Sequence, residues 1–270
     1  MASFKYIFLF VVLAGLTSCE DTVNVDLDTA EPRLVIDAGI GWVKGTDGSR
    51  QTVKLSTTTD YYTSEIPPVS NAVVSITNSD GTRFDFKETP GTGIYVCTNF
   101  IPVIGETYEL TVTVDEQTYT ASEQLISVPG ITRIEQDNET GFGGDEIEVT
   151  FYYQDNAEED NHYMARFDAD VLVNPEYDID SDKFTQGNEM FDSFSHEDLE
   201  AGDSIDISLS GISERFDNYM SLILEAEESG PFGTPPANIR GNIINTTAEE
   251  NFAYGYFRLS EVDKTLYVVE

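Results

Sequence analysis

Basic residues, histidine and cysteine are all scarce in this sequence, and the shortage of basic residues limits the partners that the chain can have. Lys and Arg together number 14 against 50 Asp and Glu, which gives a formal net charge of −36 over 270 residues. Such a charge repels phosphate backbones, so we expect no nucleic-acid partner. It also disfavours docking to anionic lipid through a basic surface. The charge favours solubility instead.

Histidine occurs only twice, which limits the catalytic arrangements that the chain can form. His162 follows a run of acids, and His196 lies within Ser195-His196-Glu197-Asp198. A Ser-His-Asp triad needs a nucleophile on a sharp turn, and the G-x-S-x-G pattern of that turn is absent. The close pair of ligands typical of a zinc site is absent as well. We therefore expect a protein that is not an enzyme.

The first nineteen residues have the pattern of a lipoprotein signal peptide, residues 1–19. Lys5 is their only charge, residues 6–16 are apolar, and the small residues Thr17 and Ser18 precede Cys19. A positive start, a short apolar core and a small-residue cleavage site are typical of secretory signal peptides. The core is shorter than the roughly 20 residues that span a bilayer as a helix. A cysteine at the cleavage site matches the bacterial lipobox, which predicts covalent lipid on Cys19; an ordinary signal peptide is the alternative.

Cys97 is then left without a disulfide partner, and we expect it to be a buried thiol that packs as a small hydrophobic group. Residues 20–31 are polar and acidic, and predict a tether between the lipid and the folded part. Glu20 and Asp21 directly follow Cys19, which resembles the surface-export signal of Bacteroidetes lipoproteins. Simple solvation of the tether is the alternative. The prediction is a protein anchored to the outer membrane and facing the cell exterior.

Residues 32–128 predict an all-β unit. Short segments with β-branched and aromatic residues alternate with turn signals, the clearest being Asn78-Ser79-Asp80-Gly81. Segments of this kind at this spacing are typical of an immunoglobulin-like β-sandwich. The predicted strands cover residues 33–40, 52–56, 72–77, 82–87, 93–97, 107–114 and 117–121.

Residues 129–270 predict a second β-rich domain that carries one α-helix, with the boundary at Val128-Pro129-Gly130. Ile212, Phe216, Tyr219 and Ile223 recur at helical spacing, which predicts a helix over 212–228. Ser210 or Ser213 can cap its start. We expect its apolar stripe to cover one end of the second domain. The predicted strands cover residues 146–153, 162–173, 204–209, 252–259 and 266–269.

One acidic segment resembles a calcium-binding loop. Asp178, Asp180 and Asp182 alternate, and Glu189 follows eleven residues after Asp178, as the ligands of an EF-hand do. The sixth position is Lys183 where the motif requires glycine, and no predicted helices flank the segment. A weak calcium site at these four acids and a solvated acidic segment both remain open.

Two segments are candidates for partner binding. Tyr61 and Tyr62 precede Pro67-Pro68, and exposed tyrosines can stack on a sugar or on a partner. Residues 230–243 are rich in proline and glycine and contain Phe232 and Arg240, which predict a docking edge. Internal pairing of Arg240 with Glu225 or Glu249 is the alternative.

Five stretches resemble the Bacteroidetes lipoprotein family catalogued as domain of unknown function 4249. They are PPVSNAVVSI at 67–76, GIY at 93–95, GETYELTV at 105–112, GISERFDNYM at 211–220 and PFGTPPANIRGNI at 231–243. The resemblance implies an outer-membrane lipoprotein often found alongside TonB-dependent transporters. It supplies no catalytic residues and no known ligand.

The expected function is therefore that of a non-enzymatic lipoprotein on the cell surface, accessory to a TonB-dependent transporter in the capture or uptake of an unidentified ligand. The alternative is a calcium-supported adhesin or a glycan-binding module that acts alone, and a hydrolase is the third hypothesis. No cofactor is expected beyond the lipid on Cys19 and the calcium considered above.

Overall fold

Strands with alternating buried and exposed residues make up most of the protein. We describe a computed structural model for residues 31–60, 63, 65–141, 144, 146–228 and 238–270. The described residues contain fifteen strands and one helix, so the prediction of a mainly β protein with one helix is confirmed. The seven predicted strands of the first half are all present. Their bounds are β1 Leu34–Val43, β2 Gln51–Thr57, β3 Val73–Asn78, β4 Arg83–Thr89, β5 Ile94–Cys97, β6 Thr107–Val114 and β7 Gln117–Ile126.

These seven strands form a closed ring with the last strand of the chain, β15 (Tyr254–Val268). The order is β15-β1-β2-β5-β4-β3-β6-β7, and β7 pairs back onto β15. Both pairings of β15 in the ring are parallel: Val35 to Val43 lie opposite Tyr254 to Val262, and Leu125 lies opposite Leu259. The described strands thus form a barrel-like ring where the sequence predicted an immunoglobulin-like sandwich. The difference arises because β15, more than a hundred residues away in sequence, closes the sheet.

Side chains fill the inside of this ring, as is usual for about eight strands. Ile36, Ala38 and Ile40 point inward from β1, and Phe257 and Leu259 point inward from β15. Cys97 belongs to the same cluster and is a buried free thiol, as predicted. Because alternate residues of a strand face opposite sides, Asp37, Gly39 and Arg258 lie on the outside of the ring. That outer face is where the candidate site lies.

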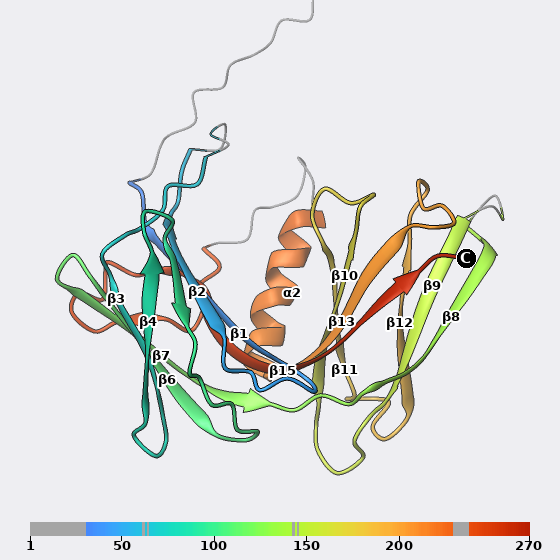
Figure 1. Cartoon of the computed structure of the whole chain (residues 1–270), viewed down its shortest axis with the longest axis horizontal. Helices are drawn as coiled ribbons and strands as arrows, with labels where there is room; N and C mark the ends of the chain where they lie inside the picture. The colour runs from blue at the N-terminus through green and yellow to red at the C-terminus, as the bar shows by residue number, and fades with distance from the viewer. Residues whose placement is uncertain (1–30, 61–62, 64, 142–143, 145, 229–237) are drawn as a thin grey trace, which may run out of the picture. The chain divides into compact units, whose positions relative to one another are not determined.

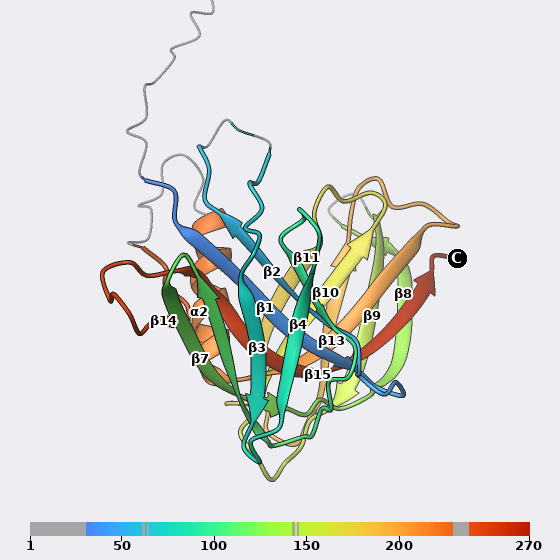
Figure 2. The ribbon, with the colours of Figure 1, turned by 60° about the vertical axis from the view of Figure 1, so that its left-hand side comes forward.

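The C-terminal half of β15 leaves the ring and joins a second group of strands (Figures 1 and 2). There it pairs antiparallel with β13, and the order continues to β10 and β11. A separate three-stranded sheet, in the order β12-β9-β8, packs against these strands through aromatic contacts such as Phe151–Phe167, with ring centroids 5.7 Å apart. The bounds are β8 Ile131–Thr140, β9 Glu146–Gln154, β10 His162–Ala169, β11 Glu176–Ser181, β12 Glu189–Ser195 and β13 Ser204–Ile212.

The sheet therefore runs across the predicted domain boundary. Buried residues do fall into separate clusters, one inside the ring and one between the strands β9, β10, β12 and β13. However, Pro32–Glu270 is one compact unit, and β15 contributes to both clusters or to their edges. The division into domains 32–128 and 129–270 stays a prediction.

The predicted helix is present as α2, Glu214–Glu228. It begins two residues later than predicted because Ile212 ends β13, and Ser213 is its cap: the Ser213 Oγ accepts the N–H of Phe216 at 3.3 Å. Glu214 and Asp217 in the first turn suit the positive end of the helix dipole. Asp217 also contacts His162 of β10, with 2.5 Å between Oδ2 and Nδ1. No helix of the described residues is long and apolar enough to cross a membrane.

The described end of the 231–243 stretch lies along β15 and seals the ring. The side chain of Asn242 makes the hydrogen bonds that a neighbouring strand would make with the backbone of Phe257. Its Nδ2 donates to the Phe257 carbonyl at 2.7 Å, and its Oδ1 accepts the Phe257 N–H at 2.9 Å. Gly241 approaches so closely that a Cβ on it would lie 1.8 Å from the carbonyl oxygen of Gly255. Beyond Asn242, the short strand β14 (Ile244–Asn245) pairs with β7.

Candidate functional site

The candidate site is a pocket where α2 covers the outer face of β1 and β15. The cavity measures about 260 Å³. Its lining comes from three elements that are far apart in sequence. The residues are Asp37 and Gly39 of β1, Phe216 and Tyr219 of α2, and Gly255, Tyr256 and Arg258 of β15.

Arg258 supplies the positive charge of this pocket. It lies opposite Gly39 in the parallel pairing, and the missing side chain of Gly39 leaves space beside the guanidinium. Its Nη1 donates to the Ser260 Oγ at 3.0 Å, and the guanidinium carbon lies 5.2 Å from the centre of the Phe216 ring. No described Asp or Glu forms an ion pair with it. Acids outnumber basic residues 50 to 14 in this chain, so an arginine that forms no ion pair with a described carboxylate is available to bind an anion.

Burial governs the electrostatics of Arg258. Loss of solvent around the guanidinium lowers the pKa of Arg258, and the nearby charge of Asp37 opposes that shift. An arginine keeps its proton in proteins, so the desolvated charge stays in place and is costly. An anion that entered the pocket and accepted its remaining N–H groups would relieve that cost.

Three aromatic rings form the apolar part of the pocket. Tyr256 contacts Phe216 at 5.0 Å and Tyr219 at 4.9 Å between ring centroids. Its hydroxyl donates to Glu123 Oε2 at 3.2 Å, and burial raises the pKa of Tyr256 to about 12. Burial and the charge of Asp37 also raise the pKa of Tyr219. Both phenols are therefore neutral donors at physiological pH.

The histidines do not form a triad with serine in the described residues. His162 contacts Asp217, as above, and the Nδ1 of His196 accepts the N–H of Asp198 at 3.2 Å. Ser221 Oγ donates to the other oxygen of Asp217, Oδ1, at 3.1 Å, but no hydrogen bond joins a serine hydroxyl to an imidazole among the described residues.

The four acids predicted to bind calcium are not brought together. Asp178 and Asp180 lie on β11, a strand rather than the loop that the motif requires. Asp182 is buried, and its carboxylate accepts the N–H of Asn161 at 2.9 Å. Glu189, at the start of β12, forms an ion pair with Arg133. Within the described residues, no three His, Cys, Asp or Glu side chains are placed to hold a metal ion, and Asp178 and Asp180 lie on a strand rather than on a loop.

One of these acids takes part in a different arrangement. Asp180 hydrogen-bonds to Asp192 of β12, and burial together with the Asp180 charge raises the pKa of Asp192 to about 8. The hydroxyl of Tyr153 is buried nearby and has no hydrogen-bond partner among the described residues. Sequence reasoning missed Asp192 because nothing in its neighbourhood indicates that β11 and β12 face each other.

Among the predicted partner-binding residues, only Arg240 lies in the described part of the chain. Tyr61, Tyr62 and Phe232 lie outside it, as does Cys19. Arg240 is exposed, and its guanidinium carbon lies 3.7 Å from the centre of the Phe252 ring. The guanidinium of Arg33 lies 4.1 Å from the same centre. The expected alternative, an ion pair with Glu225 or Glu249, is not found.

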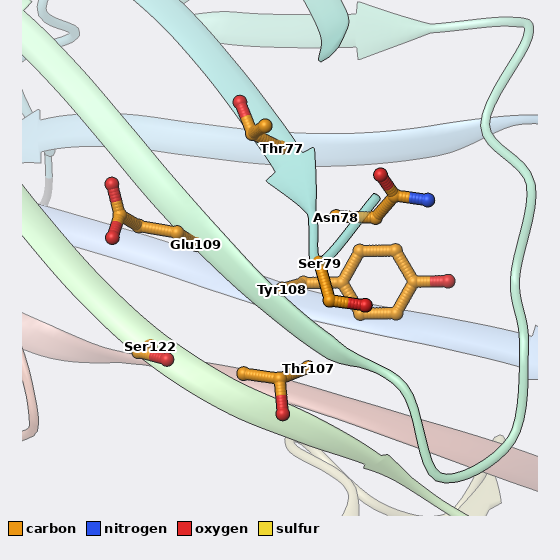
Figure 3. Close-up of a pocket in the computed structure, with 7 residues that line it drawn as sticks. All are labelled: Thr77, Asn78, Ser79, Thr107, Tyr108, Glu109 and Ser122. Atoms are coloured by element: carbon orange, nitrogen blue, oxygen red, sulfur yellow. The ribbon is translucent and has the colours of Figure 1, made fainter. Parts of the chain in front are cut away.

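A second pocket lies on the outer face of the ring, at β3, β6 and β7 (Figure 3). It measures about 250 Å³. Its lining offers hydroxyl, amide and carboxylate groups, and it also includes Tyr108, which is fully buried. The residues are Thr77, Asn78, Ser79, Thr107, Tyr108, Glu109 and Ser122.

The fold and the site together define a mainly β protein with a closed ring of strands and a helix over a small cationic and aromatic pocket. The chain belongs to the family described as domain of unknown function (DUF4249), whose sequence model matches residues 20–265. No curated protein matches this sequence.

Comparison with solved structures gives only distant likenesses. A two-domain fibronectin type III segment of chicken tenascin is 9% identical, covers 67% of this chain and 90% of its own, and has a TM-score of 0.22. The FN1–FN3 domains of chicken CNTN1 are 14% identical over 65% of this chain and 57% of theirs, with a TM-score of 0.26. A DUF4785 family protein from Legionella pneumophila is 10% identical over 66% and 52%, with a TM-score of 0.25. At these TM-scores the likeness does not establish a shared fold.

Proposed function

We propose that this protein is a non-enzymatic lipoprotein of the outer membrane that captures a small ligand for a TonB-dependent transporter. Lipid on Cys19 anchors it, and the acidic tether 20–31 holds the folded part on the outside of the cell. The observation that carries the capture role is the pocket beneath α2. There a desolvated arginine forms no ion pair with any described carboxylate, and aromatic rings surround a space of ligand size.

The transporter part of the proposal rests on the family resemblance and on the surface available for docking. Arg240, which is exposed, and Arg33, which is half-buried, place two cations on the ring of Phe252. Cations at this point offer a contact for an acidic loop of a barrel protein, since the rest of the chain is strongly acidic. Phe232, Tyr61 and Tyr62 stay candidates for the same docking edge.

Affinity purification from native outer membranes tests this proposal. A C-terminal tag on the full-length protein should recover a TonB-dependent transporter, identified by mass spectrometry, after solubilisation in mild detergent. The Arg240→Ala variant should recover less transporter at equal membrane abundance, whereas Arg83→Ala, an exposed arginine of β4, should recover as much as wild type. Recovery of the tagged protein alone, even after chemical cross-linking, would reject the accessory role.

Glycan binding is the second candidate function, and the pocket in Figure 3 is the observation that favours it. Its hydroxyl and amide groups match the hydrogen bonds that sugar hydroxyls make. A glycan array with the purified protein tests it, with Glu109→Gln and Asn78→Ala as variants. Loss of a wild-type signal in both variants supports binding at this pocket, and the absence of any signal rejects it.

A further inference from the structure

Two opposite charges line the pocket beneath α2 without neutralising each other. Asp37 lies opposite Tyr256 in the register of β1 and β15, and Arg258 lies opposite Gly39, two residues further along. Both side chains face outward from the ring into the same cavity. No ion pair joins them among the described residues, although the charge of Asp37 acts on Arg258 and partly opposes the lowering of its pKa by burial.

From this arrangement we propose that the pocket binds a small zwitterion, an α-amino acid or a very short peptide. The carboxylate of the ligand accepts hydrogen bonds from Arg258, and its ammonium group lies against Asp37. The inference deepens the proposed function, since it names the ligand of the capture site.

The aromatic rings strengthen the ammonium end of the site. Tyr219 and Tyr256 lie between the helix and β15, with Phe216 beside the guanidinium. The face of an aromatic ring attracts a cation, and the attraction is stronger where water is excluded. The same rings offer an apolar surface for a ligand side chain.

The size of the cavity limits the ligand. About 260 Å³ is below the range of about 300–1,000 Å³ typical of pockets for drug-sized molecules. One amino acid or a dipeptide with small side chains fits such a volume, and a folded partner segment does not.

Charge excludes the simpler ligands. An inorganic anion would gain from Arg258 and lose against Asp37, and a simple amine would do the reverse. Lys54 of β2 lies opposite Asp37 and is exposed, so it adds positive charge at the rim without pairing with Asp37. A ligand with both charges satisfies both residues of the pocket.

Calorimetric titration of the full-length protein in detergent tests the inference. The probes are L-leucine, L-phenylalanine and Ala-Ala, together with leucinamide, which lacks the carboxylate, and N-acetyl-leucine, which lacks the ammonium group. We expect at least one zwitterionic probe to bind, and each blocked leucine analogue to bind at least tenfold more weakly than leucine. Hydrogen bonds to charged groups are of this size.

Substitutions at Arg258 and Asp37 test which residue binds each charge of the ligand. Arg258→Gln and Asp37→Asn should each weaken binding of the zwitterion at least tenfold, and leave thermal unfolding cooperative. The exposed pair on β4 supplies matched controls: Arg83→Gln and Asp85→Asn should change binding less than threefold. If Arg258→Gln does not fold, Asp37→Asn still decides, because the Asp37 side chain is exposed and has no hydrogen bond to another described residue.

Three results would overturn the inference. They are failure of every zwitterionic probe to bind, equal binding of either blocked analogue, and unchanged binding to folded Asp37→Asn. If a transporter still co-purifies with a wild-type protein that binds no probe, the zwitterion is rejected and the capture proposal survives. If the zwitterion binds and no transporter is recovered, the pocket inference survives and the accessory role is rejected.

Discussion

Asp192 is a buried carboxyl group that faces a second acid, and its protonation should control stability near neutral pH. Only 6% of the residue is exposed, and burial with the charge of Asp180 raises the pKa of Asp192 to about 8. An Asp in the unfolded chain has a pKa of about 3.9. Between these values the folded state holds more protons than the unfolded state, so stability falls as pH rises from about 4 to about 8.

Replacing this carboxyl by an amide should remove that dependence. Asp192→Asn should raise the Tm at pH 8, by roughly 2–4 °C for each kcal/mol recovered, and leave the Tm at pH 4 nearly unchanged. Calorimetric melting across pH 4–9 measures this. Asp170→Asn, an exposed acid, serves as the control. The same pH slope in Asp192→Asn and in wild type would contradict the assignment.

Arg240 contributes little to stability although it contacts an aromatic ring. It is exposed and lies 3.7 Å from the centre of Phe252, where a cation–π contact is worth about 0.5–1 kcal/mol. Arg33 on the same ring repels it and reduces that value. Arg240→Ala should therefore lower the free energy of unfolding by less than about 1 kcal/mol in urea denaturation.

Phe252→Leu provides the comparison, since it removes the ring from both arginines and should cost more than Arg240→Ala. A loss well above 1 kcal/mol in Arg240→Ala would identify a buried structural role and withdraw this residue from the docking edge.

At the scale of elements, the described end of the 231–243 stretch has a structural explanation. Gly241 contacts the backbone of Gly255, which itself has φ of 95° and lies against the Ile36 carbonyl. A side chain at Gly241 would force the segment away from β15 and break the hydrogen bonds of Asn242. The resemblance of this stretch to a family motif therefore reflects, at least in residues 241–242, how the ring is sealed.

Gly241→Ala should lower the free energy of unfolding by about 1–3 kcal/mol or more, because overpacking against backbone cannot relax through a side chain. Urea denaturation measures the loss. Gly130→Ala is the control, since a Cβ there meets only Asp263 at an ordinary 3.6 Å and the backbone is not left-handed. Equal stability of the two variants would mean that the close approach is not required.

Elements with a local signal were predictable from the sequence, and elements defined by distant pairing were not. Strands β1 to β7 show alternation and turn residues, and the stripe through Phe216 and Tyr219 marks α2. In contrast, β11 is acidic enough to resemble a loop, and β8 has no clear alternation. The single strand β15 looked like two, because residues 260–265 between the two predicted strands contain only one apolar residue, Val262.

The candidate site was not predicted from the sequence, because it too depends on pairing between distant segments. Its charged residues, Asp37 and Arg258, come together only through a parallel pairing across more than two hundred residues. The helix stripe was expected to cover one end of a second domain. It packs there against Met164, Tyr177 and Ile179 of β10 and β11, and also against Tyr256 of β15, where the pocket reaches Asp37 and Gly39 of β1.

At the scale of the whole molecule, Cys19 should decide whether the protein stays on a membrane. Cys19→Ala should move the protein to the soluble fraction or leave the precursor uncleaved, because firm anchoring needs more than one lipid chain and this residue would carry them all. Fractionation and immunoblotting measure the distribution. Cys97→Ala is the control and should remain with membranes, since that thiol is buried in the ring. A Cys19→Ala protein that is cleaved and still membrane-bound would contradict lipidation.

Strand β15 should make the folded part of the chain a single cooperative unit. It completes the ring between β1 and β7, and its C-terminal half pairs with β13 outside the ring. Separation at residue 128 would therefore remove one strand of the ring and expose the edges of β1 and β7, which favours aggregation. We expect a fragment of residues 32–128 to show no cooperative unfolding, whereas residues 32–270 should unfold in one transition.

Trp42, the only tryptophan, lies on β1, so its fluorescence reports on the ring while far-ultraviolet circular dichroism reports on all strands. The two probes should give the same urea midpoint for residues 32–270. A folded 32–128 fragment, or two separated midpoints, would instead support independent domains on either side of residue 128.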